Sequence, residues 1–137
     1  MIKTLLRIFR SGLTFSMTMK SCALGHYTVG HEIGHNFGCH HDPDTDTNTF
    51  FSYGHGHLIE QGVGTEGHRT ILAYGAPNHW ARANYYSNPA VIFPETQTPT
   101  GVAGLSNNAR VFTENRFAFA SLGDESKMCG TGERLEI

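Results

Sequence analysis

No apolar run in this chain of 137 residues is long enough to cross a bilayer. A strong charge of either sign is also missing, because ten Lys and Arg residues against twelve Asp and Glu leave a formal net charge of −2. There is therefore no electrostatic case for binding nucleic acid or an anionic membrane. With 39% hydrophobic residues, the composition predicts one soluble domain with a modest core.

The chemistry of the chain is concentrated in residues 31–42, which read H-E-x-x-H-x-x-G-x-x-H-D. His31 and His35 are four residues apart, so on a helix both imidazoles project from one face. Gly38 can take the left-handed conformation that ends a helix. The chain then doubles back, and His41 can complete a three-histidine zinc site. Three protein ligands leave the fourth position of a tetrahedral zinc to water, which is typical of catalytic sites.

Glu32 lies one residue round from the histidine face, close enough to reach a metal-bound water but not placed to be a third ligand. We expect it to take a proton as that water attacks a peptide carbonyl and to pass the proton to the leaving amine. Two alternatives stay open. The chain could be a catalytically inactive zinc-binding fragment or homologue, or a module that holds peptides or partners without cleaving them.

These residues resemble the metzincin zinc endopeptidases. Asp42, directly after the third histidine, and the string H-E-I-G-H-N-F-G narrow the likeness to the reprolysin (adamalysin-like) branch. Further segments resemble downstream parts of bacterial reprolysin-like peptidases: residues 69–74, 85–89, 99–104 and 108–110. The resemblance implies an α+β, zincin-like catalytic domain. Its zinc helix, Met-turn-like loop and C-terminal helix are expected to be present, with little of the N-terminal sheet.

The resemblance covers residues 13–123, which we expect to form the catalytic domain. Residues 1–12 show no family likeness, and the tail 124–137 is polar and expected to be loose. Residues 2–10 have an amphipathic helix pattern that charges break too often for a signal peptide. Residues 13–20 alternate apolar and polar side chains, as in a strand with one buried face. Because metzincins carry more of this sheet upstream, the chain looks truncated at its N-terminal side.

Two helices are expected in the likeness region. The first begins near Tyr27 or Thr28 and carries the motif. Its residues expected to face the core are Val29, Ile33 and Phe37. The second is capped by Asn107 or Asn108 and runs to about Leu122.

By resemblance, residues 69–74 form the tight turn beneath the zinc, where metzincins have a Met. Leu72 stands in that place and is apolar and of similar volume, so the exchange should affect zinc binding little. In the astacin and serralysin branches, a Tyr two residues later reaches the zinc and then the oxyanion. Tyr74 is therefore a catalytic candidate, and the alternative is a Tyr packed below the site. Residues 85–89 should lie at the wall of the S1′ pocket.

Two other clusters are weaker candidates for metal sites. Residues 42–48 superficially resemble a calcium loop but lack its central Gly and its final Glu, so a solvated acidic loop is favoured. His55 and His57 could bind a second metal. Without a carboxylate or cysteine nearby they make a poor site, and an exposed Gly-rich loop is favoured.

The three cysteines, Cys22, Cys39 and Cys129, allow one disulfide and one free thiol. The likeness implies a secreted enzyme acting on protein or peptide substrates, and in that compartment a bridge is expected. Pairing Cys22 with Cys39 would staple the two ends of the zinc helix, but the sequence does not establish it. A buried thiol at Cys39 stays open, as does a thiolate ligand to the metal.

Overall fold

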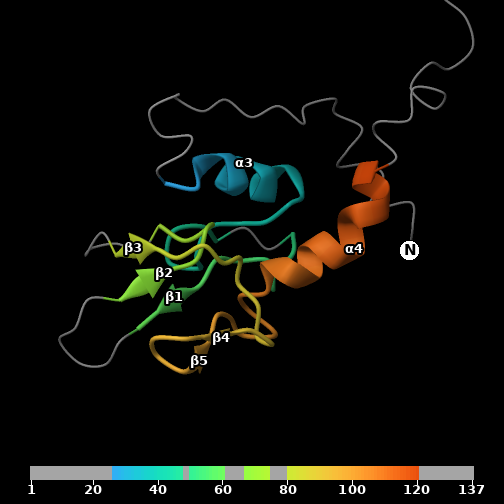
Figure 1. Ribbon diagram of the computed structural model, residues 1–137. Helices are drawn as coiled ribbons and strands as arrows, with labels where there is room; N and C mark the ends of the chain where they lie inside the picture. Colours follow the sequence, from blue (N-terminus) through green and yellow to red (C-terminus); the bar gives the residue numbers. More distant parts are fainter. Residues whose placement is uncertain (1–25, 48–49, 61–66, 75–79, 121–137) are drawn as a thin grey trace, which may run out of the picture.

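The computed structural model describes residues 26–47, 50–60, 67–74 and 80–120. These residues form a small α+β arrangement of two helices and five two-residue strands (Figure 1). In chain order the elements are α3 (Thr28–Asn36), β1 (Leu58–Ile59), β2 (His68–Arg69), β3 (Ala81–Arg82), β4 (Ile92–Phe93), β5 (Thr98–Pro99) and α4 (Asn108–Ala120). The patterns expected over residues 2–10, 13–20 and 124–137 lie outside the described residues. No helix in the described ranges is long and apolar enough to cross a membrane.

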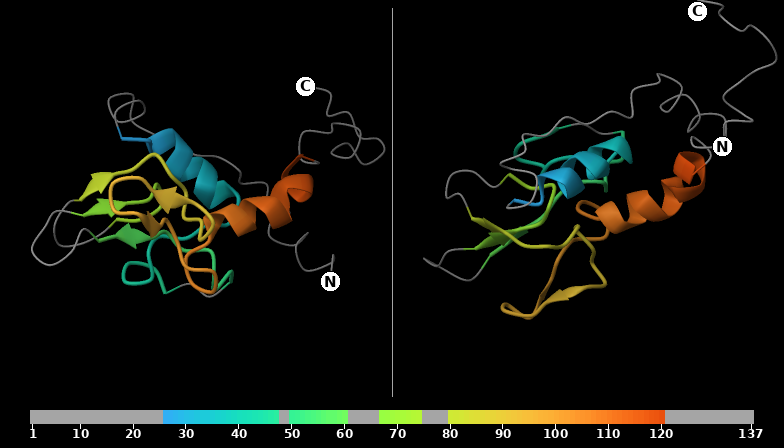
Figure 2. Two further views of the ribbon diagram at one scale, coloured as in Figure 1. Left: turned by 60° about the horizontal axis from the view of Figure 1, so that its bottom comes forward. Right: turned by 45° about the horizontal axis from the view of Figure 1, so that its top comes forward.

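The strands form two small sheets. The first has the order β1-β2-β3, with β1 antiparallel to β2 and β2 parallel to β3, and the second is the antiparallel pair β4-β5. In Figure 1, α3 lies above the three-stranded sheet, β4-β5 lies below it, and α4 extends to one side. The right-hand view of Figure 2 shows the same order of layers. The histidine helix therefore covers one face of the sheet.

Helix α3 begins at Thr28, as the sequence predicts, and ends in a Schellman motif. The Gly38 N–H donates to the His35 carbonyl at 2.9 Å, and the Cys39 N–H donates to the Gly34 carbonyl at 3.0 Å. Gly38 has a φ of 95°, which a residue with a Cβ rarely adopts. The predicted role of Gly38 in ending the helix is confirmed, and this ending turns the chain back toward the helix.

The face of α3 that packs on the protein is not the one expected from hydrophobic periodicity. Val29 and Ile33 are 44% and 42% exposed, so placing them in the core was wrong. Phe37 is half-buried, and its ring stacks on that of Phe119 at 3.9 Å between centroids.

The face of α3 that packs on the protein carries His31 and Gly34, which are buried, and Gly30, which is half-buried. A Cβ on Gly34 would lie 2.6 Å from a methyl carbon of Leu72, and the Gly30 carbonyl accepts a hydrogen bond from the Tyr86 hydroxyl at 2.6 Å. The helix backbone therefore approaches the 69–74 segment more closely than side chains would allow. Periodicity could not reveal this face because glycine offers no apolar side chain to the pattern.

The core formed by the described residues consists of two small clusters. The first contains Cys39, Ile71, Leu72 and Val111, and the second contains Ile59, Ala83 and Phe93. Cys39 is a free, buried thiol, so the bridge considered between Cys22 and Cys39 is not formed. Burial raises the pKa of its thiol to about 12, and the sulfur is not part of the group of side chains that could hold a metal ion. Cys22 and Cys129 lie outside the described residues.

Helix α4 is capped as expected, because the Asn107 side-chain oxygen accepts a hydrogen bond from the Arg110 N–H at 3.1 Å. The helix is described to Ala120, and the predicted end at Leu122 lies beyond the described residues. The buried Asn115 amide donates to the Phe37 carbonyl at 2.8 Å. Helix α4 therefore supports the end of α3 from which the chain returns to the third histidine.

We expect Gly56→Ala to destabilise the protein by about 1–3 kcal/mol, as overpacking typically does. The added Cβ would lie 2.5 Å from the Ala73 nitrogen and 2.8 Å from the Leu72 carbonyl carbon, and backbone cannot move aside as a side-chain tip can. The matched control is Gly104→Ala, because nothing lies within 4 Å of that Cβ. Urea unfolding of both variants measures the difference, and equal effects would contradict the packing argument.

Candidate metal centre

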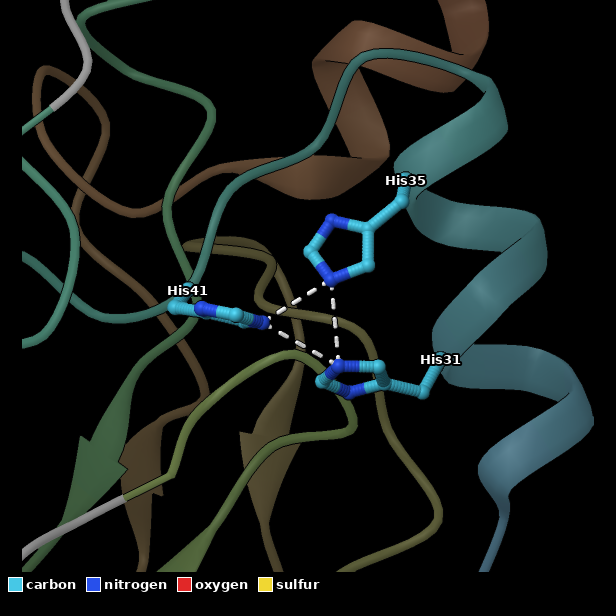
Figure 3. Close-up of side chains that lie close together, drawn as sticks. All are labelled: His31, His35 and His41. Carbon is cyan, nitrogen blue, oxygen red and sulfur yellow. Dashed lines mark hydrogen bonds between the residues drawn. The ribbon is translucent and has the colours of Figure 1, made fainter. Parts of the chain in front are cut away.

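Three imidazoles converge on one point between α3 and the chain that follows it. His31 and His35 come from α3, and His41 comes from the returning segment (Figure 3). Their Nε2 atoms lie 3.1 Å apart for His31 and His35, 2.9 Å for His35 and His41, and 3.2 Å for His31 and His41. The three residues predicted as ligands are therefore brought together. Among the described residues they are the one group of His, Cys, Asp and Glu close enough to hold a metal ion.

Backbone carbonyls fix the orientation of two of the three rings. His31 Nδ1 lies 2.7 Å from the Ile71 carbonyl oxygen, and His35 Nδ1 lies 2.9 Å from the Cys39 carbonyl oxygen. A carbonyl can only accept, so each Nδ1 carries the ring proton and each Nε2 presents a lone pair. Lone pairs facing each other at such distances repel unless a cation lies between them. The donor set therefore fits a metal ion.

The surroundings of His31 and His41 favour the neutral imidazole, which is the state that binds metal. Burial lowers the pKa of His31 to about 4, although the hydrogen bond to the Ile71 carbonyl opposes this. Burial, together with the charge of His35, also lowers the pKa of His41. At neutral pH the imidazoles of His31 and His41 are therefore available to bind a cation.

Asp42 connects the third histidine to the 69–74 segment. The carboxylate is 2% exposed and accepts hydrogen bonds from the Tyr74 N–H at 2.8 Å and from the Thr45 hydroxyl at 3.0 Å. The expectation of a solvated acidic loop is therefore wrong for Asp42. Its carboxylate lies in the interior because it accepts a hydrogen bond from the Tyr74 N–H, which would otherwise have no partner in a strand. The loop is acidic and open at Asp44, which is exposed.

Tyr74 stands beside the histidines and not beneath them. Its ring meets the His41 ring edge-on at 4.5 Å and the His31 ring at 5.3 Å, and the residue is 48% exposed. Leu72 is fully buried and packs under Gly34. The 69–74 segment therefore presents an apolar side chain below α3 and a phenol at the open side of the site.

Glu32 follows His31 on α3 and is half-buried. Its negative charge raises the pKa of Arg82, although burial and the neighbouring Arg69 lower that pKa more strongly. Within the described ranges, the Glu32 carboxylate forms no ion pair. The geometry leaves this carboxylate available next to the three-histidine centre.

The other two histidine candidates have structural positions. His55 is 5% exposed, and its Nδ1 lies 2.8 Å from the His41 carbonyl oxygen, so it supports the backbone of the third histidine. His57 Nδ1 lies 3.0 Å from the Ser106 hydroxyl. The expectation of an exposed loop is therefore wrong. The loop is covered because Gly56 lets it lie directly against the backbone of the 69–74 segment.

Two arginines near the site were not singled out from the sequence. Arg69 donates to the carbonyls of Trp80 at 2.8 Å, Ala73 at 3.1 Å and Tyr74 at 2.8 Å. It thereby clamps the end of the segment that carries Tyr74. Arg82 lies on the next strand. No local motif marks either residue, because their proximity comes from the pairing of β2 with β3.

The sequence is similar to those of known metallopeptidases. Residues 6–42 match the Metallo-peptidase family M12B Reprolysin-like. A peptidyl-Asp metalloendopeptidase of Stenotrophomonas maltophilia (strain K279a) is 38% identical over 108 residues, which are 78% of this chain and 25% of that protein. Proteins of the same name from Xanthomonas campestris pv. campestris and Pseudomonas fragi are 36% and 40% identical, over 78% and 56% of this chain and 24% and 51% of their own lengths.

The chain thus spans about a quarter of the length of the first two of these relatives and about half of the third. No solved structure matches the chain significantly.

We expect the protein to bind one zinc ion per chain and His35→Ala to weaken that binding strongly, because one of three converging nitrogens is lost. His26→Ala is the control, since His26 is exposed and lies outside the cluster. Metal analysis after equilibrium dialysis at several zinc concentrations gives both affinities. An undiminished one-to-one zinc content in His35→Ala would rule out this ligand set.

Proposed function

We propose that this chain, a relative of the reprolysin-like metallopeptidases of family M12B, is part of a zinc-dependent endopeptidase. The observation that carries the proposal is the convergence of three histidine Nε2 atoms next to the carboxylate-bearing position of an H-E-x-x-H helix. His31, His35 and His41 would hold the ion. Three imidazole donors with an open fourth position suit catalytic zinc.

The correspondence with metzincin domains is part of the proposal. Helix α3 would be the zinc helix, residues 69–74 the Met-turn-like loop, and α4 the C-terminal helix. Leu72 supports this assignment, because it is fully buried under Gly34, one residue before His35. The carbonyl of the preceding Ile71 is the one that orients His31. The domain bounds 13–123 remain a prediction from the resemblance.

When bound, zinc supplies a Lewis acid and a water of lowered pKa. Glu32 then acts as the general base. It is half-buried next to His31, and its negative charge raises the pKa of Arg82. It takes a proton from the attacking water and delivers it to the leaving amine. His31, held by the Ile71 carbonyl, keeps its ring fixed throughout.

Tyr74 is proposed to assist at the developing oxyanion. Its ring lies edge-on against His41 and His31, and nearly half of the residue is open to solvent, so the phenol can meet a substrate. A hydroxyl donor of this kind stabilises negative charge on a carbonyl oxygen in the transition state. The Asp42 carboxylate and Arg69 hold the backbone of Tyr74 on its two sides.

The substrate class is proposed from the relatives. They are named peptidyl-Asp metalloendopeptidases, and we propose that this chain also acts on peptides that contain Asp. Because the chain spans about a quarter of the first relatives, catalysis by the whole protein is likewise a proposal. Secretion is expected from the family likeness alone.

We expect Glu32→Gln to keep zinc bound and to lower peptide cleavage by at least about 10²-fold, which is the lower end of what general-base catalysis contributes. Gln has the size and polarity of Glu but cannot accept the proton. Zinc content and cleavage of an unstructured protein substrate are measured on the same preparations. If zinc affinity fell and the rate per bound zinc stayed unchanged, Glu32 would be an orienting partner of a ligand histidine.

Tyr74→Phe should leave zinc content and folding unchanged while lowering kcat more than it changes KM. The phenyl ring preserves the contacts with His41 and His31, and only the proposed oxyanion donor is lost. Losing one such donor costs about 10²–10³-fold in well-studied acyl-transfer enzymes. Steady-state kinetics with one peptide substrate decides, and an unchanged kcat would show that the hydroxyl takes no part.

A further inference from the structure

Two arginines flank Tyr74 at the side of the metal centre. Arg69 on β2 and Arg82 on β3 are register partners in the parallel ladder, so they lie next to each other. Their guanidinium carbons are 6.0 and 5.9 Å from the centroid of the Tyr74 ring, and that ring is 4.5 Å from the His41 ring. One aromatic ring therefore separates a pair of positive charges from the metal-binding imidazoles.

The two arginines differ in how their donors are used. Arg69 donates through Nε and Nη1 to three backbone carbonyls, which makes it a clamp for the turn. Arg82 donates to the His26 carbonyl through Nη1 at 2.8 Å. Its Nε is buried and has no hydrogen-bond partner in the part of the chain that the structure describes. Arg82 thus has directional donors left for a ligand.

The charge around Arg82 is not balanced. Among the described residues, neither arginine forms an ion pair with a carboxylate. Glu32 influences Arg82 from beyond ion-pair distance, and its effect is smaller than that of burial or of Arg69. Like charges on adjacent strands and an unsatisfied buried N–H are both unfavourable. An anionic group bound at the Arg82 guanidinium would offset the like charges.

We propose that Arg82 is the specificity-determining residue, and that its guanidinium binds the side-chain carboxylate of an acidic residue next to the scissile bond. This assignment rests on the proposed peptidase function. Guanidinium and carboxylate form short, charge-assisted hydrogen bonds, often two at once, and an amide of the same shape cannot supply the charge. Arg69 acts as a positioning residue, since it holds the Tyr74 segment against which Arg82 lies.

A purely structural role for Arg82 is the competing explanation. The bond from Nη1 to the His26 carbonyl secures the chain just before α3, and that bond requires one N–H. It does not account for a buried Nε without a partner or for the absence of a paired carboxylate in the described ranges. Arg82→Gln separates the two roles, because Gln retains an N–H donor for His26 and loses the charge.

The test measures binding and not turnover. Zinc-loaded Glu32→Gln protein is titrated calorimetrically with two peptides that differ only in carrying Asp or Asn at one position. We expect the Asp peptide to bind about ten- to a hundredfold more tightly, which is what a hydrogen bond to a charged group is worth. Adding Arg82→Gln should remove the preference while zinc content stays the same.

Arg110→Gln is the matched control. Arg110 pairs with Glu114 on α4 and stacks on Tyr53, away from the histidines, so it should leave the preference intact. Equal binding of the two peptides by the Glu32→Gln protein, or an Asp preference that survives Arg82→Gln, would overturn the assignment. If Arg82→Gln loses zinc or its fold, Arg82→Lys serves in its place. Lysine keeps the charge without the planar fork and should retain a reduced Asp preference, and an undiminished preference would also overturn it.

The failure of this inference and the failure of the proposed function are distinguishable. A parent protein that cleaves peptides but binds Asp and Asn peptides equally retains the function and loses the role of Arg82. A parent that cleaves nothing, while its Glu32→Gln form prefers Asp through Arg82, keeps the binding site and loses the enzyme.

Discussion

The metal centre depends on two hydrogen bonds from imidazoles to backbone carbonyls. The Cys39 carbonyl orients His35, and the Ile71 carbonyl orients His31. The first carbonyl is set by the left-handed turn at Gly38 that ends α3, and the second by the 69–74 segment. Backbone geometry, and not the side chains at those two positions, therefore fixes the orientation of two of the three imidazoles.

The 69–74 segment is held from several directions, and this explains how so small a fold can position a site. Asp42 accepts the Tyr74 N–H, Arg69 clasps the carbonyls at the end of the segment, and the Gly56 backbone presses against it. Asp42 and Gly56 come from other parts of the chain, whereas Arg69 clamps the segment from within. A segment constrained in this way is organised before any substrate arrives, which is the condition for effective positioning.

The sequence predicted the elements whose determinants are local. The converging histidines, the helix ending at Gly38 and the capped second helix follow from spacing, backbone freedom and capping. Predictions from the sequence were wrong where contacts between distant segments determine which residues are buried. Val29 and Ile33 were assigned to the core because they are apolar, whereas glycines make the actual contact. The burial of His55 and the place of Arg82 arise from pairings between distant segments, which no local pattern records.

The backbone and the side chain of Cys39 have different roles. Its carbonyl serves the metal centre, while its sulfur is sealed in the core with a pKa raised to about 12. Oxidation and alkylation both proceed through the thiolate, which the burial of this position disfavours. The Cys39 thiol therefore has low reactivity. Because the residue is buried and its sulfur lies outside the ligand group, Cys39 contributes to the centre through its backbone alone.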